Sequence, residues 1–298
     1  MLVLDSITRR FGDRLALDDV SLSVPDGRMV GFVGANGAGK TTTMRIALGV
    51  LAADSGTVTF RGREPDLAVR RRFGYMPEER GLYPKGRLLE QLVFLARLHG
   101  VDRAAAARRG RDLLDRLGLG DRADDRLESL SLGNQQRVQV AASLVHDPEL
   151  LVLDEPFSGL DPLAVDAMAE LMRERVRAGV GVLFSSHQLD LVDRLCDELV
   201  ILHAGRVVAA GEPEALRRER AGSRYSLVSD ADLDWVRDVP GVQVLERGPR
   251  GVVLQLPEAG PDADLDQRLL AEAVRRGPVR SFAPVLPSLS ELFQEVSR

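Results

Sequence analysis

The sequence has 298 residues, of which 44% are hydrophobic and 29% charged, and its formal net charge is −5. This composition is ordinary for a globular protein with room for one large domain and a small one. The negative balance argues against a protein that holds nucleic acid through many phosphate contacts. Cys196 is the only cysteine, so an internal disulfide is excluded.

No stretch of the sequence approaches the roughly 18 uninterrupted apolar residues of a membrane-spanning helix. The N-terminal residues, MLVLDSITRRFG, lack the basic start and the long apolar run of a signal peptide. We therefore expect a cytoplasmic protein. Any path through a membrane would have to be supplied by another chain.

The beginning of the chain predicts β-strands with one helix among them. Loose alternation of apolar residues and strong turn signals indicate strands at Leu2–Ile7, Leu15–Val24, Met29–Val33 and Asp54–Arg63. The run Met29–Val33 is short and apolar, as in a strand buried on both faces. Gly39–Val50 follows it with a helical pattern.

The next part of the chain is first helical and then alternates between strands and helices. From Arg87 to about Gly118, leucines recur at helical spacing. The alternating segments are strand Leu150–Leu153, helix Leu163–Arg177, strand Val180–Ser185, helix Leu189–Cys196, and a hairpin of Leu199–Leu202 with Arg206–Ala210. This alternation predicts an α/β fold with a mainly parallel sheet and helical layers.

The character of the sequence changes near Ala221–Ser223. The predicted elements are strand, helix, strand, strand, helix, strand and a last helix, at Tyr225–Val228, Ala231–Arg237, Val242–Leu245, Val252–Leu256, Asp264–Arg276, Val279–Pro284 and Leu289–Val296. The order βαββαβ is typical of a ferredoxin-like unit. We predict two domains, residues 1–220 and a small α+β domain of residues 221–298.

The segment GANGAGKTT, at Gly34–Thr42, lies between a predicted strand and a predicted helix and fits the pattern of a phosphate-binding loop, or P-loop. Its glycines let the backbone fold tightly, so that N–H groups point at phosphate oxygens, and the helix presents its positive end to the same anion. Lys40 adds a point charge for the β- and γ-phosphates, and the Thr41 hydroxyl suits Mg²⁺. The candidate nucleotide-binding residues are Gly34, Asn36, Gly37, Ala38, Gly39, Lys40, Thr41 and Thr42.

Two carboxylates, Asp154 and Glu155, follow the apolar strand Leu150–Leu153. They lie at the edge of a parallel sheet where ligands bind. Asp154 is a candidate Mg²⁺ ligand. Glu155, pointing the other way in the pleat of the strand, is expected to orient the attacking water. His187 follows another apolar strand and is predicted to reach the γ-phosphate from the same edge.

With these residues the chain resembles the ATP-binding-cassette (ABC) ATPases over roughly residues 2–218. The segment LSLGNQQR, at Leu130–Arg137, matches the signature of that family and has no obvious use at the nucleotide of its own chain. The resemblance implies that Ser131 and Gly133, with Gln135 beside them, contact a nucleotide bound by a second subunit. It also implies an antiparallel β-subdomain and a helical subdomain at about residues 87–140.

Three further positions are assigned by the same resemblance. Phe11 matches the aromatic residue that stacks on adenine, with a core phenylalanine as the alternative. Asp161 matches a loop that crosses the dimer. Glu78 stands where the family commonly has a glutamine that contacts Mg²⁺ and the attacking water, so it is both a metal and a catalytic candidate. Leu132 and Asn134 also depart from the usual signature residues.

The stretch Gly74–Gly86 and the segment Pro287–Phe293 resemble the ATPase subunits of bacterial drug-resistance and sodium-extrusion exporters. This resemblance implies ATP and Mg²⁺ as cofactors and a head-to-tail dimer with a second copy or a related cassette. It further implies a separately encoded membrane permease, no nucleic acid, and a peripheral position on the inner face of the cell membrane. The candidate permease surface consists of Glu79, Leu82, Tyr83 and Leu88.

An alternative is a soluble ABC ATPase with a regulatory role or a role on ribosomes or nucleic acid. Translation factors of this superfamily carry two cassettes in one chain, and DNA-repair relatives carry long coiled-coil insertions. The sequence has neither feature, which favours the exporter subunit.

Overall fold

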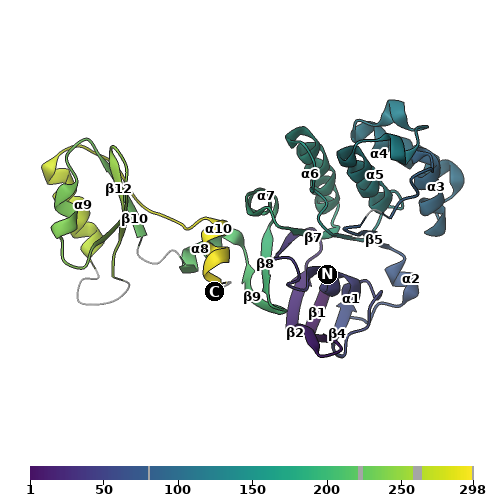
Figure 1. Cartoon of the computed structure of the whole chain (residues 1–298), viewed down its shortest axis with the longest axis horizontal. Helices are drawn as coiled ribbons and strands as arrows, with labels where there is room; N and C mark the ends of the chain where they lie inside the picture. Colours follow the sequence, from purple (N-terminus) through teal and green to yellow (C-terminus); the bar gives the residue numbers. More distant parts are fainter. Residues whose placement is uncertain (80, 221–223, 258–263, 297–298) are drawn as a thin grey trace. The chain divides into compact units, whose positions relative to one another are not determined.

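The computed structural model describes residues 1–79, 81–220, 224–257 and 264–296 (Figure 1). The described residues divide into two compact units, one from Met1 to Pro213 and one from Glu214 to Val296.

The first unit is built on a sheet with the strand order β5-β6-β7-β3-β8-β9. Its strands are β3 (Met29–Val33), β5 (Phe73–Met76), β6 (Leu150–Leu153), β7 (Gly181–Ser186), β8 (Glu198–His203) and β9 (Arg206–Gly211). Neighbouring strands from β5 to β8 run parallel, and β9 runs antiparallel to β8. Strands β3, β6 and β7 are buried along their whole length, which explains their largely apolar sequences. The predicted parallel sheet is confirmed.

A second sheet in this unit is antiparallel, in the order β2-β1-β4, with β1 (Leu2–Phe11), β2 (Arg14–Val24) and β4 (Ser55–Phe60). One cluster of buried apolar side chains joins both sheets to helix α1 (Lys40–Ala47). The helix is shorter than the predicted Gly39–Val50, because the Gly49 N–H turns back to the Ile46 carbonyl at 2.9 Å and closes it.

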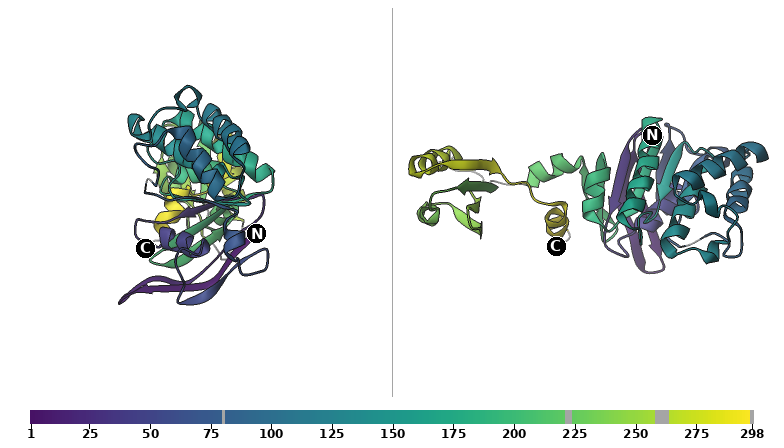
Figure 2. Two further views of the ribbon diagram at one scale, coloured as in Figure 1. Left: turned by 90° about the vertical axis from the view of Figure 1, so that its right-hand side faces the viewer. Right: turned by 90° about the horizontal axis from the view of Figure 1, so that it is seen from above.

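The helices of the first unit are α1, the short α2 (Leu67–Arg70), α3 (Leu88–Leu98), α4 (Arg103–Arg116), α5 (Leu132–Leu144), α6 (Pro162–Arg177) and α7 (Leu189–Leu195), with 3₁₀ turns at Gly120–Arg122 and Leu127–Ser129. Helices α3, α4 and α5 lie together next to β5 (Figures 1 and 2). The predicted helical region from Arg87 to Gly118 is split in two because the Asp102 carboxylate caps a new helix at the Ala104 and Ala105 N–H groups.

The second unit contains an antiparallel sheet in the order β11-β12-β10-β13. Helix α8 (Pro213–Arg220) begins at the boundary between the units. The further elements of the second unit are β10 (Arg224–Ser229), the 3₁₀ helix η3 (Asp234–Asp238), β11 (Gln243–Arg247), β12 (Gly251–Gln255), α9 (Leu265–Arg276), β13 (Val279–Pro284) and α10 (Leu289–Val296). A separate apolar cluster, including Leu227, Leu254 and Leu269, forms its core. This strand order agrees with the predicted ferredoxin-like unit.

One predicted helix of this unit is wrong. Residues 231–237 form no α-helix, and η3 begins only at Asp234. The Ser229 hydroxyl accepts from the Ala231 N–H at 3.1 Å, and the Asp232 carboxylate accepts from the Asp234 N–H at 3.0 Å. These side chains bind the N–H groups of Ala231 and Asp234 in local turns, and such turns compete with the start of a helix.

Across the described ranges of the chain, no helix is both long and apolar enough to cross a membrane.

Candidate nucleotide-binding site

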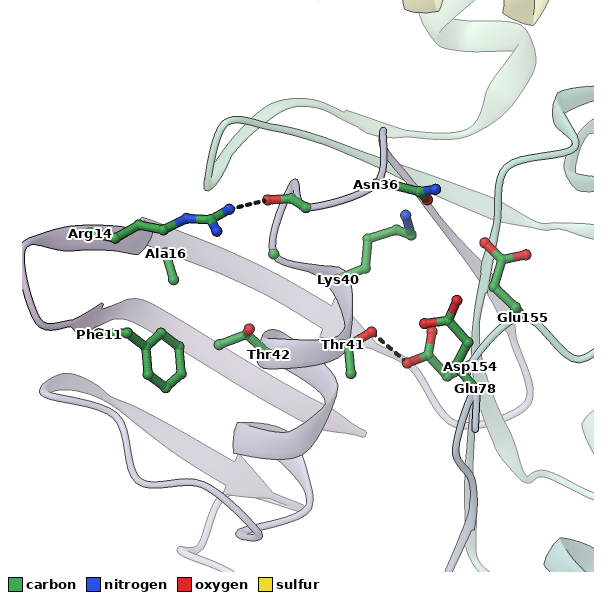
Figure 3. Close-up of a pocket in the computed structure, with 12 residues that line it drawn as sticks. Phe11, Arg14, Ala16, Asn36, Lys40, Thr41, Thr42, Glu78, Asp154 and Glu155 are labelled. Carbon is green, nitrogen blue, oxygen red and sulfur yellow. Dashed lines mark hydrogen bonds between the residues drawn. The ribbon is translucent and has the colours of Figure 1, made fainter. Parts of the chain in front are cut away.

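A cavity of about 570 Å³ opens beside the first turn of α1 (Figure 3). It is lined by Phe11, Arg14, Ala16, Asn36, Gly37, Gly39, Lys40, Thr41, Thr42, Glu78, Asp154 and Glu155. Phe11 and Arg14 stand on one side of the P-loop, and three carboxylates stand on the other. Segments that are far apart in the sequence therefore converge on one space.

The P-loop connects β3 to α1, and Gly39 is the N-cap of the helix. Its φ of +112° belongs to the left-handed region, and a Cβ there would lie 2.9 Å from the Ala16 carbonyl oxygen, so only glycine fits. Because glycine has no capping side chain, the first amides of α1 remain available to another acceptor. Gly34 and Ala38 are buried and do not line the cavity.

Lys40 is only 7% exposed. Its Nζ donates to the Gly34 carbonyl at 2.7 Å and to the Ala35 carbonyl at 3.3 Å. The ammonium is thus held inside the loop, at the wall of the cavity, where a phosphate oxygen is a stronger partner than either carbonyl.

Asp154 follows β6 and is 1% exposed. One of its oxygens accepts from the Thr41 hydroxyl at 2.7 Å, and the other accepts from the Ser185 hydroxyl at 2.6 Å. Paired hydroxyl and carboxylate oxygens suit Mg²⁺, which usually takes one or two carboxylates together with phosphates and water. The described residues include no cluster of three or more His, Cys, Asp or Glu suited to a metal ion.

Glu155 has a φ of +51°, in the left-handed region that costs a side-chain-bearing residue energy. The expectation that the pleat of a strand directs it is wrong, because β6 ends at Leu153 and this backbone turn sets the direction. The Glu155 N–H donates to the Ser185 hydroxyl at 2.8 Å, and the Glu155 carboxylate pairs with Nδ1 of His187 at 2.9 Å.

His187 is exposed and does not line the cavity. It meets the carboxylate of Glu155, so a contact with the γ-phosphate stays a prediction. Ser185, which touches both Asp154 and Glu155, was not identified from the sequence. Its signal is a hydroxyl at the carboxyl end of β7, the neighbour of β6 in the sheet.

Phe11 is 46% exposed at the cavity, so the alternative of a core phenylalanine is wrong. Arg14 lies opposite Phe11 in the β1–β2 hairpin, and its guanidinium donates to the Gly37 carbonyl at 3.3 Å. No motif marks Arg14 in the sequence. Glu78 lies just beyond β5 and lines the opposite side of the cavity.

The residues Ser131, Gly133, Gln135 and Asp161 do not line this cavity, and we call them the signature surface. Ser131 is exposed and caps α5 by accepting from the Asn134 N–H at 3.4 Å. A Cβ on Gly133 would lie 3.1 Å from the Gly159 carbonyl oxygen, which shows how closely the two loops approach.

Gln135 and Asp161 also serve their own chain. The Gln135 side chain donates to the Leu130 carbonyl at 3.0 Å. Asp161 caps α6 by accepting from the Ala164 N–H at 2.9 Å, and it pairs with Arg137 at 3.1 Å. The Ala164 hydrogen bond, with Arg137 in support, holds the pKa of Asp161 below its ordinary value.

The ABC transporter family matches residues 17–158, and the C-terminal domain of DrrA1-3-like ATP-binding proteins matches residues 211–297. Together with the cavity, these matches place the chain in a class of nucleotide-binding ATPases. The chain belongs to the ATP-binding subunits of ABC transporters, which hydrolyse ATP.

Over 295 residues the chain is 39% identical to the uncharacterized ABC transporter ATP-binding protein YhaQ of Bacillus subtilis, covering 99% of this chain and 98% of that protein. It is 33% identical over 214 residues to the linearmycin resistance ATP-binding protein LnrL of Bacillus subtilis, covering 71% of this chain and 69% of that one. A solved ATP-binding subunit of an ABC transporter has a TM-score of 0.69 and 36% identity, covering 74% of this chain and 93% of that one. The resemblance to this family inferred from the motifs is confirmed.

Proposed function

We propose that the chain is the ATP-hydrolysing subunit of an exporter. Two copies, or one copy and a related cassette, close head to tail around two ATP–Mg²⁺ and drive a separately encoded membrane permease. The names of two relatives support export: the linearmycin resistance protein, and the Nod factor export ATP-binding protein I of Burkholderia lata, which is 36% identical over 236 residues and covers 78% of each chain.

The observation that carries the dimer is the separation of two sets of residues within one chain. The cavity collects the P-loop and the carboxylates, whereas the signature surface lies outside it. Ser131 is exposed at the N-terminus of α5, where the positive end of a helix favours an anion. A second copy would supply the nucleotide that this end lacks in its own chain.

At the cavity, Lys40 and the first amides of α1 bind the β- and γ-phosphates, and Phe11 stacks on the adenine. Thr41 and Asp154 would hold Mg²⁺, with Glu78 beside them. When bound there, Mg²⁺ would supply positive charge that neutralises the phosphate oxygens. Ser131 of the second copy stabilises the transferring phosphoryl group.

Glu155 orients the attacking water. Its carboxylate is 11% exposed, and its Oε2 atom is engaged by His187, so Oε1 is the atom we assign to the water. The Ser185 hydroxyl fixes Asp154 and Glu155 relative to each other, because it donates to the side chain of one and accepts from the backbone of the other.

The permease would bind the surface around Glu79 and Tyr83, at the inner face of the membrane. Tyr83 is 70% exposed, Glu79 is exposed and Leu82 is half-buried. Leu88 does not belong to this surface: it is 0% exposed, because it lies on the core side of α3. The proposed permease surface therefore consists of Glu79, Leu82 and Tyr83.

The test is the substitution Glu155→Gln in the full chain. It should still bind ATP but accumulate a closed dimer, measured by light scattering after size exclusion, with turnover reduced about 100-fold or more. The control is the double variant Lys40→Ala, Glu155→Gln, which should stay monomeric with ATP. Rapid turnover in Glu155→Gln, or an isolated monomer that hydrolyses ATP at the full rate, would contradict the proposal.

A further inference from the structure

Gln136 connects helix α5, which Ser131 caps, to the backbone of Glu155. It lies on the buried side of α5 and is 6% exposed. Its Nε2 donates to the Glu155 carbonyl at 2.9 Å and to the Pro156 carbonyl at 3.1 Å. Both partners are acceptors, so the side-chain NH₂ group, and not its oxygen, must face them.

The backbone at Glu155 needs such support. Its left-handed φ of +51° is unfavourable for a residue with a side chain. The Glu155 carbonyl also accepts from the Ser158 N–H at 3.2 Å, which closes the turn after β6. Gln136 therefore bonds to the tight turn that aims the Glu155 carboxylate at the cavity.

Three side chains from other segments hold Glu155, and each acts on a different group. Ser185 holds its N–H at 2.8 Å, His187 holds its carboxylate at 2.9 Å, and Gln136 holds its carbonyl at 2.9 Å. Ser185 and His187 both come from the end of β7, whereas Gln136 comes from helix α5. Without it, the peptide between residues 155 and 156 loses its partner from α5.

We propose that Gln136 is a positioning residue for ATP hydrolysis. It keeps the backbone of Glu155 in the left-handed conformation and thereby sets the direction of the carboxylate that orients water. Gln136 does not line the cavity, so it acts on the rate of hydrolysis and not on nucleotide binding. The inference rests on the role of Glu155 in the proposed function.

The first experiment is Gln136→Met, which keeps the volume and removes both donors. We expect kcat for ATP to fall about 10- to 100-fold, while KM and the Kd for ATP change less than about twofold, since the P-loop is untouched. Ser143→Ala is the matched control: Ser143 is buried in the same helix and bonds to the Val140 carbonyl at 2.8 Å. It should keep the kcat of the unsubstituted chain.

Gln136→Asn provides a milder variant should the methionine variant fold poorly. Its amide is one methylene too short to reach both carbonyls, yet it stays polar. An unchanged kcat in a folded variant would overturn the inference. So would a parallel loss of kcat and ATP affinity, which would point to a merely structural role.

The second experiment combines Gln136→Met with Glu155→Gln and measures the residual rate in single-turnover assays with labelled ATP. If Gln136 acts through the Glu155 carboxylate, the double variant should hydrolyse ATP no more slowly than Glu155→Gln alone. Independent, multiplying effects would overturn the inference. ATP-dependent association of the unsubstituted chain, measured alongside, distinguishes the two proposals: its absence contradicts the dimer, not Gln136.

Discussion

The nucleotide-binding cavity and the signature surface both contain a hydroxyl side chain, a glycine and an aspartate, but they differ in how these residues are used within one chain. In the cavity, Lys40, Thr41 and Asp154 converge on a space that is open to a ligand. On the signature surface, Ser131 and Asp161 are exposed residues that cap helices α5 and α6. The P-loop and the carboxylates therefore share one cavity, whereas the signature residues lie outside it.

This difference shows how nucleotide binding by one chain can be measured separately from association between two chains. A residue of the cavity should change nucleotide affinity even in a single diluted chain. A residue of the signature surface should leave that affinity alone and change only the activity of the assembled protein. The predictions below test this contrast, in order of decreasing effect on ATP binding and hydrolysis.

The largest effect is expected from Lys40→Ala. A buried ammonium beside phosphate contributes on the order of 4 kcal/mol before desolvation, so we expect ATP affinity to fall about 100-fold or more. Calorimetric titration of the diluted chain measures it. Lys85→Ala, at the only other lysine of the sequence and on an exposed loop, is the control and should bind ATP normally. If Lys40→Ala binds ATP as tightly as the unsubstituted chain does, the ATP phosphates do not bind at Lys40.

Ser131→Ala should have a smaller effect and act only on the assembled protein. We expect turnover at high protein concentration to fall about tenfold, with the ATP affinity of the diluted chain within twofold. The lost cap also costs about 1 kcal/mol of stability. Asp102→Ala removes the cap of α4 instead and should lose similar stability without slowing hydrolysis. If both variants slow hydrolysis equally, Ser131 is only a cap.

The smallest effect on ATP binding and hydrolysis is expected at the connection between helix α5 and the sheet, which bears on stability. His146 lies between α5 and β6, and its ring stacks on that of His99 with the ring centroids 3.8 Å apart. Its Nε2 donates to the Phe73 carbonyl at 3.1 Å. Its Nδ1 is buried without a partner among the described residues. Burial, with the nearby His99 adding to it, lowers the pKa of His146 to about 4.

Because the unfolded chain takes up a proton near pH 6.5 and the folded chain only near pH 4, the stability that neutral His146 provides is lost as the pH falls through this window. Between pH 7 and pH 5 the loss is about 2 kcal/mol. His146→Gln keeps a donor for the Phe73 carbonyl and does not titrate, so its stability should fall less. Urea unfolding at the two pH values measures the difference, and parallel losses in both proteins would refute it.

The sequence predicted the cavity well where its residues are consecutive. The P-loop, the strand before it and the helix after it form one local unit, so Gly39, Lys40 and Thr41 could be placed from their spacing. Asp154 and Glu155 could be placed because a short apolar strand delivers them to a known edge of a parallel sheet.

The residues that the sequence missed depend on partners from distant segments. Strand β5 is a short run, FGYM, and is defined by its pairing with β6, where Phe73 lies opposite Leu150. Arg14, Ser185 and Gln136 contribute through contacts across a hairpin, a sheet edge and a helix face. Helical spacing alone did not tell which side of α3 faces the core, so Leu88 was misplaced.

The conformation of Glu155 could not be foreseen either, because a positive φ at a glutamate runs against local preference and is sustained by tertiary hydrogen bonds.

Helix α5 carries Ser131 at its exposed tip and Gln136 on its inner side, about 7.5 Å apart along the axis. Because intrahelical hydrogen bonds keep α5 stiff over this distance, a tilt at its N-terminus also displaces the Gln136 amide that bonds to the Glu155 carbonyl. In the proposed dimer, a neighbour that contacts this tip would therefore shift the Glu155 carboxylate, to which we assign the orientation of water, in the subunit that it touches. Hydrolysis at the two sites would then be coupled.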